Sequence, residues 1–187
     1  IKMGFWPGGD RDGNPFVNTG ITLRVADALR GGIIKCYYLE IRKLRRRLTF
    51  KGVDVLLAGL EKQLYNNIFI PENRTEITRE DILGILNDIR EILIHQHNGL
   101  FGYLIDDLIN KVHVFGLHFA SLDIRQDSSV HKKVFTAIAA SGSFFPSAYA
   151  EWNDEKKVEF LTGNSKKLPE KDYGEPVIND TFESIRA

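Results

Sequence analysis

The stretch VFGLHFASLDIRQD, residues 114–127, breaks the helical pattern that fills most of the chain. It has a glycine near its start, clustered apolar residues and no repeat of three or four. This pattern predicts a buried strand over about residues 117–124, because a strand covered on both faces is nearly continuous in apolar residues. The predicted strand ends in a charged cluster around Arg125.

A second candidate strand also runs into a charged loop. It covers residues 4–7 and opens the stretch GFWPGGDRDGNPF, residues 4–16. In parallel α/β folds, ligands bind at the carboxyl ends of the strands. We therefore expect the two charged loops to face one site.

The rest of the chain is predicted to be mostly helical, because apolar side chains recur at steps of three and four. The predicted helices cover residues 21–30, 34–48, 54–69, 79–99, 101–112, 128–141 and 154–161, with a last helical turn near 179–187. Thr78 and Asp81 resemble a capping box, and Asp127 or Ser128 caps the next long helix. Gly31-Gly32 interrupts the first helical pattern or merely weakens it. The predicted fold class is mainly α with a few short strands.

Composition narrows the class of protein. Lys and Arg total 25, as do Asp and Glu, so the net charge is zero. This balance argues against a protein whose whole surface binds nucleic acid, although a local basic patch is still allowed. We expect no nucleic-acid partner. No apolar run reaches the roughly 18 residues of a membrane span and no leader pattern is present, so we expect no membrane partner and a cytoplasmic location. The single cysteine, Cys36, excludes an internal disulfide, and its apolar neighbours predict a buried, inert thiol.

Arg125 is the first candidate for ligand binding. Its guanidinium is a rigid fork of donors that matches a phosphate or a carboxylate and stays charged when partly buried. Asp123 and Asp127 would orient or neutralise it, and a structural ion pair at the strand end is the alternative. In residues 8–15, adjacent glycines would let the backbone approach a ligand, although a tight, salt-bridged turn also explains them.

A basic run at residues 42–51 supports a different function, that of a helical binding module. In that alternative, the basic face at residues 42–47 contacts an acidic partner. The run has no interleaved aromatic residues, so a solvated or inter-subunit helix face is favoured over nucleic-acid binding. The five histidines have no metal-binding spacing, and no zinc site is expected.

Taken together, two motifs resemble the phosphoenolpyruvate carboxylase family. They lie at Trp6–Pro15 and Val112–Ser128, and a weaker likeness continues into YAEWNDEKKVEFL, residues 149–161. The resemblance implies a lyase that carboxylates phosphoenolpyruvate with bicarbonate to give oxaloacetate and phosphate, which supplies the tricarboxylic acid cycle. It also implies Mg²⁺ or Mn²⁺ as cofactor, a homotetramer, and a helix-rich (β/α)8 barrel of the TIM type.

The resemblance assigns roles by position. The residues that it places at the substrate are Arg125 on the phosphate, Trp6 in the apolar pocket beside the reacting carbon, and Arg11. The loop that frames this pocket is formed by Gly8, Gly9 and Asp10, and the residues that support Arg125 are Asp123 and Gln126.

The family's catalytic histidine motif and metal ligands have no counterpart in this sequence. We therefore expect residues 1–187 to be a single internal fragment of a larger catalytic domain, inactive alone. The expected layout is a barrel strand and loop near 4–16, a helical region at 19–112, a second barrel strand and loop near 114–127, and a helical region at 128–187.

Overall fold

The structure is a computed structural model. It describes residues 3–12, 14, 16–70, 72, 76–142, 145–164 and 172–186. Gly13 and Pro15 of the first motif lie outside the described residues. The chain divides into two compact units. Unit 1 is Ile1–Phe5 with Arg24–Leu122, and unit 2 is Trp6–Leu23 with Asp123–Ala187.

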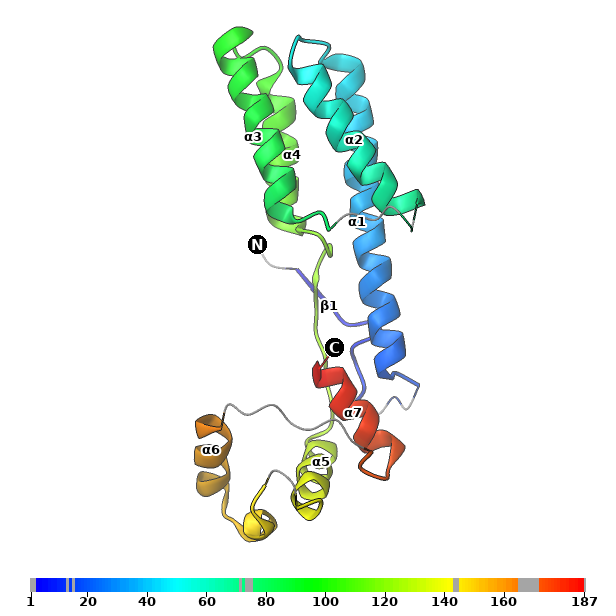
Figure 1. The fold of residues 1–187 in the computed structure, drawn as a ribbon, viewed down its shortest axis with the longest axis vertical. Helices are drawn as coiled ribbons and strands as arrows, with labels where there is room; N and C mark the ends of the chain where they lie inside the picture. The colour runs from blue at the N-terminus through cyan, green and yellow to red at the C-terminus, as the bar shows by residue number, and fades with distance from the viewer. Residues whose placement is uncertain are drawn as a thin grey trace. The chain divides into compact units, whose positions relative to one another are not determined.

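Unit 1 is built from helices (Figure 1). These are most of α1 (Thr19–Arg47), α2 (Val53–Phe69), α3 (Arg79–Gln96) and α4 (Gly102–Phe115). Helix α1 runs without a break through Gly31-Gly32, so the glycines weaken the helical pattern and do not interrupt it. Two glycines cost a helix about 1 kcal/mol each, and burial of the apolar side chains that follow them offsets that cost.

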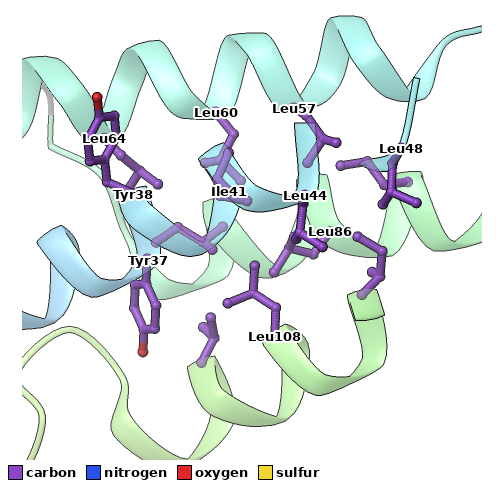
Figure 2. Packing of buried hydrophobic residues seen from close by; sticks show 14 of the residues in the cluster. Tyr37, Tyr38, Ile41, Leu44, Leu48, Leu57, Leu60, Leu64, Leu86 and Leu108 are labelled. Carbon is purple, nitrogen blue, oxygen red and sulfur yellow. The ribbon is translucent and has the colours of Figure 1, made fainter. Parts of the chain in front are cut away.

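The core of unit 1 lies where these four helices meet, as Figure 2 shows. Ile41 and Leu44 of α1, Leu60 of α2, Leu86 of α3 and Leu108 of α4 are all buried in one apolar cluster.

Cys36 does not join this core. The predicted buried thiol is wrong, because the side chain is exposed. At about 100° per residue, Cys36 lies on the side of α1 opposite to buried Ile34, Tyr38 and Ile41.

Helix α3 begins with the predicted capping box. The Thr78 side chain accepts a hydrogen bond from the Asp81 backbone N–H, and the Asp81 carboxylate accepts one from the Thr78 backbone N–H. Two hydrogen bonds that the Asp81 carboxylate accepts, first from the Thr78 hydroxyl and then from the Thr78 backbone N–H, lower the pKa of Asp81.

Two short strands complete unit 1. Strand β1 (Gly4–Phe5) pairs in parallel with β2 (Ser121–Leu122). Both predicted strands exist, but the buried strand over 117–124 is wrong in length and in burial, since none of these residues is buried. Phe119 has φ 67°, which is outside the β region. A buried parallel strand needs neighbours on both edges and both faces, and within the described residues β2 pairs only with β1.

Unit 2 contains α5 (Ser128–Ala140), the 3-10 helix η2 (Ser147–Glu151), α6 (Asp154–Gly163) and α7 (Pro176–Arg186). As predicted, Asp127 caps α5, its side chain accepting from Ser129 N–H. The predicted last turn is a full helix, α7, because Ile178 and Phe182 bury their side chains in a cluster with Ile138 of α5. Among the described helices, none is long and apolar enough to cross a membrane.

Candidate functional site

The two sequence motifs meet in unit 2 through their backbones. Arg125 N–H donates to the carbonyl of Gly9, and Arg11 N–H donates to the carbonyl of Arg125, both at 2.9 Å. Asp10 and Arg125 thereby form a parallel β-bridge. The two charged loops therefore lie side by side at these residues. That they face one ligand site stays a prediction.

A tight turn shapes the first loop. Gly9 N–H donates to the carbonyl of Trp6 at 2.9 Å. Gly8 has φ 84°, a conformation that residues with a Cβ rarely adopt. The hydroxyl of Thr22, at the start of α1, donates to the Gly8 carbonyl at 2.7 Å. The glycines therefore serve the turn itself, and Gly9 is buried.

Arg125 is presented at the surface of unit 2 by two neighbours. Its guanidinium carbon lies 4.1 Å from the centroid of the Trp6 ring, and its Nε donates to Asp123 Oδ2 at 3.1 Å. The side chain of Arg125 is 46% exposed. Within the described part of the chain, no acceptor takes its two Nη groups, so they remain available to an anion.

Arg11 points elsewhere. Its side chain is 3% exposed and pairs with Asp180 of α7, with Nη2 3.0 Å from Oδ2. It also donates to the Thr19 hydroxyl at 3.1 Å. The Asp180 carboxylate and carbonyl in turn accept from the N–H and hydroxyl of Thr19. Arg11 is thus a buried link between the loop, α1 and α7.

Gln126 also faces α7. Its Nε2 donates to the Thr181 hydroxyl at 3.4 Å, and its Oε1 accepts from Asp127 N–H at 3.0 Å. A cavity of about 720 Å³ in unit 2 is lined by Arg11, Gln126 and Asp180, among others. Neither Trp6 nor Arg125 lines it. The structure thus brings Trp6, Asp123 and Arg125 together and directs Arg11 and Gln126 toward α7.

The sequence did not indicate the roles of Asp180 and Thr22. Thr19 and Asp180 are separated by 161 positions, and an aspartate inside a helix matches no motif. Thr22 lies in the first turn of α1, and its local sequence likewise carries no signal of a contact with Gly8.

The basic face of α1 is partly neutralised. Glu61 of α2 pairs with both Arg42 and Arg45, and Arg42 also lies over the Tyr38 ring. Arg42, Arg45, Arg46 and Glu61 line a hollow of about 250 Å³.

The described residues include no group of three or more His, Cys, Asp or Glu side chains arranged to hold a metal ion.

Comparison with known proteins identifies the family. A model of the family described as phosphoenolpyruvate carboxylase matches residues 1–76 and 57–173. The chain belongs to the phosphoenolpyruvate carboxylase family. The resemblance carried by the two motifs is therefore confirmed.

Individual family members are similar to most of this chain. The phosphoenolpyruvate carboxylase of Gloeobacter violaceus is 29% identical and aligns with 89% of this chain and 23% of its own length. The phosphoenolpyruvate carboxylase of Shewanella halifaxensis is 24% identical over 100% of this chain and 25% of its own length. That of Aeromonas hydrophila is 28% identical over 86% of this chain and 21% of its own length. The chain thus spans about a quarter of the length of these relatives.

Proposed function

We propose that this chain forms one wall of the substrate site of a phosphoenolpyruvate carboxylase, with Arg125 holding the phosphate of phosphoenolpyruvate. The intact enzyme would use bicarbonate to convert phosphoenolpyruvate into oxaloacetate and phosphate. The observation that carries the proposal is the placement of Arg125 on the Trp6 ring. This arrangement leaves two Nη groups open within the described residues.

The geometry suits a phosphate. With Nε occupied by Asp123, the outer edge of the guanidinium can donate two parallel hydrogen bonds to phosphate oxygens. Trp6 covers one face of the guanidinium and limits its rotation. The 52% of Trp6 that remains exposed offers an apolar wall. In the proposed reaction, such a wall would keep water from the phosphorylated bicarbonate formed in the first step.

The other loop residues would hold Trp6 and Arg125 in place and would not contact the substrate themselves, Arg11 excepted. Gly8, Gly9 and Asp10 set the turn that carries Trp6 and holds the backbone of Arg125. Arg11 remains a proposed substrate-site residue, and its burial against Asp180 favours a role in holding the loop. In the same way, Gln126 would support Arg125 by anchoring its strand end to α7.

The metal and the base are proposed to come from other parts of an intact carboxylase. The family uses Mg²⁺ or Mn²⁺, and the described residues do not form a site for such an ion. The barrel, the tetramer and the cytoplasmic location remain proposals from family membership. On this proposal, the isolated chain makes no oxaloacetate, and bicarbonate-dependent turnover by it would contradict the assignment.

The direct test is binding of phosphoenolpyruvate to this chain, measured by isothermal titration calorimetry. A hydrogen bond to a charged group contributes about 1.5–3 kcal/mol, so Arg125→Gln should weaken binding roughly tenfold or more. Arg186→Gln is the matched control, because Arg186 also lies over an aromatic ring, that of Phe182, in unit 2. Equal binding by the parent chain and Arg125→Gln would refute the role of Arg125.

A kinetic test follows in an intact family member. Substitution of the arginine in its Leu-Asp-Ile-Arg-Gln motif should lower kcat/KM for phosphoenolpyruvate. An unchanged kcat/KM would contradict the proposed phosphate contact.

An acidic partner for the basic face of α1 is a second candidate function. The observation in its favour is the hollow that Arg42, Arg45 and Arg46 line, where Glu61 is the one acidic residue. Binding to a polyglutamate peptide should then weaken steeply with added salt and be lost in Arg46→Gln. Salt-independent binding, or none, would exclude this function.

A further inference from the structure

Unit 1 contains a groove of about 460 Å³ that the proposed carboxylase site does not use. Its walls include Leu29 of α1, Arg79 at the start of α3, His113 of α4 and the segment that leads from α4 into β2. Among the residues that the structure describes, no Asp or Glu lines the groove. Arg79 is therefore a cation that faces no negative charge on the described walls of the groove.

Arg79 lacks a counter-ion among the described residues. Its Nη2 lies 2.9 Å from His113 Nδ1. Because arginine only donates hydrogen bonds, this ring nitrogen must accept and is unprotonated. The Nε of Arg79 is buried and has no hydrogen-bond partner within the described chain. The Nη1 group of Arg79 has no partner among the described residues, so it can donate to an anion in the groove.

Another arginine of the same helix shows the contrast. Arg90 donates through Nε to Asp106 at 2.7 Å, and its Nη1 lies 3.9 Å from Glu91. Its charge is already balanced within unit 1. The other histidine of the groove, His118, does not substitute for Arg79 as a cation. Burial, with a contribution from the charge of Arg30, lowers the pKa of His118 despite the opposing effect of Asp27.

Apart from His118 and Ser121, the remaining residues of the groove wall have apolar side chains or are glycine, and they include a stacked aromatic pair. The rings of Phe115 and Phe119 are 5.4 Å apart and nearly parallel, with 3° between their planes. Phe119 has a left-handed φ of 67°, which is unusual for a residue with a large side chain. That backbone conformation presents a 39% exposed ring beside the groove. Pockets for small organic molecules are commonly about 300–1,000 Å³ and mostly apolar, with a few polar groups.

We propose that this groove binds a small organic carboxylate, whose anionic end pairs with Arg79 and whose flat apolar body packs against Phe115 and Phe119. The size of the groove, the unpaired cation and the aromatic wall all favour this class of ligand. The proposal is independent of Arg125 and of phosphoenolpyruvate, so it can fail or succeed separately from the proposed function.

The probe for this site is 3-phenylpropionate, titrated into the chain and followed by calorimetry and by NMR shifts of the His113 ring. For a ligand of this size, a dissociation constant in the roughly millimolar range is expected. The uncharged analogue 3-phenylpropanamide should bind about tenfold more weakly, because it cannot pair with Arg79 as an anion. Absence of 3-phenylpropionate binding, or equal binding of the two compounds, would overturn the proposal.

Two variants and one control locate the site. Arg79→Gln should reduce affinity for 3-phenylpropionate about tenfold, whereas Arg90→Gln on the same helix should leave it unchanged. Phe119→Gly should also weaken binding, because it removes the ring. Glycine adopts a left-handed φ readily, so the substitution is compatible with the fold. Thermal melts followed by circular dichroism establish that each variant is folded. Unchanged affinity in both Arg79→Gln and Phe119→Gly would place the ligand elsewhere and refute the assignment.

Discussion

The guanidinium carbon of Arg125 lies 4.1 Å from the centroid of the Trp6 ring. Trp6 begins the first family motif, and Arg125 lies near the end of the second. The backbone bonds between Gly9, Arg11 and Arg125 hold this pair in place. The contact explains why both motifs are needed for one site: one supplies the cation, and the other supplies the surface on which it rests.

Replacing Trp6 should therefore weaken anion binding by Arg125. A cation–π contact at an exposed site contributes about 0.5–1 kcal/mol, so Trp6→Leu should raise the dissociation constant for phosphoenolpyruvate roughly two- to fivefold. Calorimetric titration measures this change. Trp152→Phe is the control, because the Trp152 ring lies under a different cation, that of Lys156. An equal effect of the two substitutions would contradict the prediction.

Removing the partner of Arg11 should destabilise unit 2. Asp180→Asn leaves a 3% exposed guanidinium without its carboxylate, and an unpaired buried polar group costs about 1–3 kcal/mol or more if charged. Urea unfolding followed by circular dichroism measures the loss.

The matched control is Asp123→Asn. The pair of Asp123 with Arg125 is about half exposed, and such surface pairs contribute about 0–1 kcal/mol. If Asp123→Asn lowers the free energy of unfolding as much as Asp180→Asn does, burial of the Arg11–Asp180 pair does not contribute to stability.

The stability of the chain should fall in acid, partly through Asp127. Hydrogen bonds from Ser129, first from its side chain and then from its backbone N–H, hold the pKa of Asp127 below its usual value of 3.8. A lowered folded-state pKa gives stability that is present above the unfolded pKa and lost as the pH falls through the folded one.

Asp127→Asn should keep the cap of α5 and remove this titration. Its melting temperature should therefore fall less than that of the parent between about pH 5 and pH 2. Asp127→Ala should instead melt lower at pH 7, because it loses the cap. Identical acid profiles for the parent and Asp127→Asn would show that this carboxylate does not contribute.

Truncating the core of unit 1 should be costly. Leu86 is 0% exposed among helices α1 to α4, and Leu→Ala changes at such positions cost about 2–5 kcal/mol. Val55→Ala, at a 68% exposed position of α2, should change the free energy of unfolding by less than about 0.5 kcal/mol. Urea unfolding compares the two variants, and similar losses would contradict the core assigned here.

Local signals predicted local structure well. Apolar spacing located the helices, and the caps at Thr78 and Asp127 were found because a capping side chain bonds to backbone only two or three positions away. The strand at 117–124 was predicted too long and too buried, because strand burial depends on neighbours that a local pattern does not contain. Cys36 was misplaced for a related reason: its apolar neighbours in sequence face the core, and its own position on the helix does not.

By itself, the sequence determined the mainly helical fold class, two short strands that each run into a charged loop, and membership of the phosphoenolpyruvate carboxylase family. The helical period, the turn residues and the two family motifs are all local features, because each is contained in a short stretch of the chain. Only the tertiary structure decided which arginine is open and which is buried. Arg11 and Arg125 both lie in charged motifs, but Arg11 pairs with Asp180 of α7, whereas Arg125 lies over the Trp6 ring. These partners come from distant segments, and only the backbone pairing and side-chain packing of the folded chain bring them together.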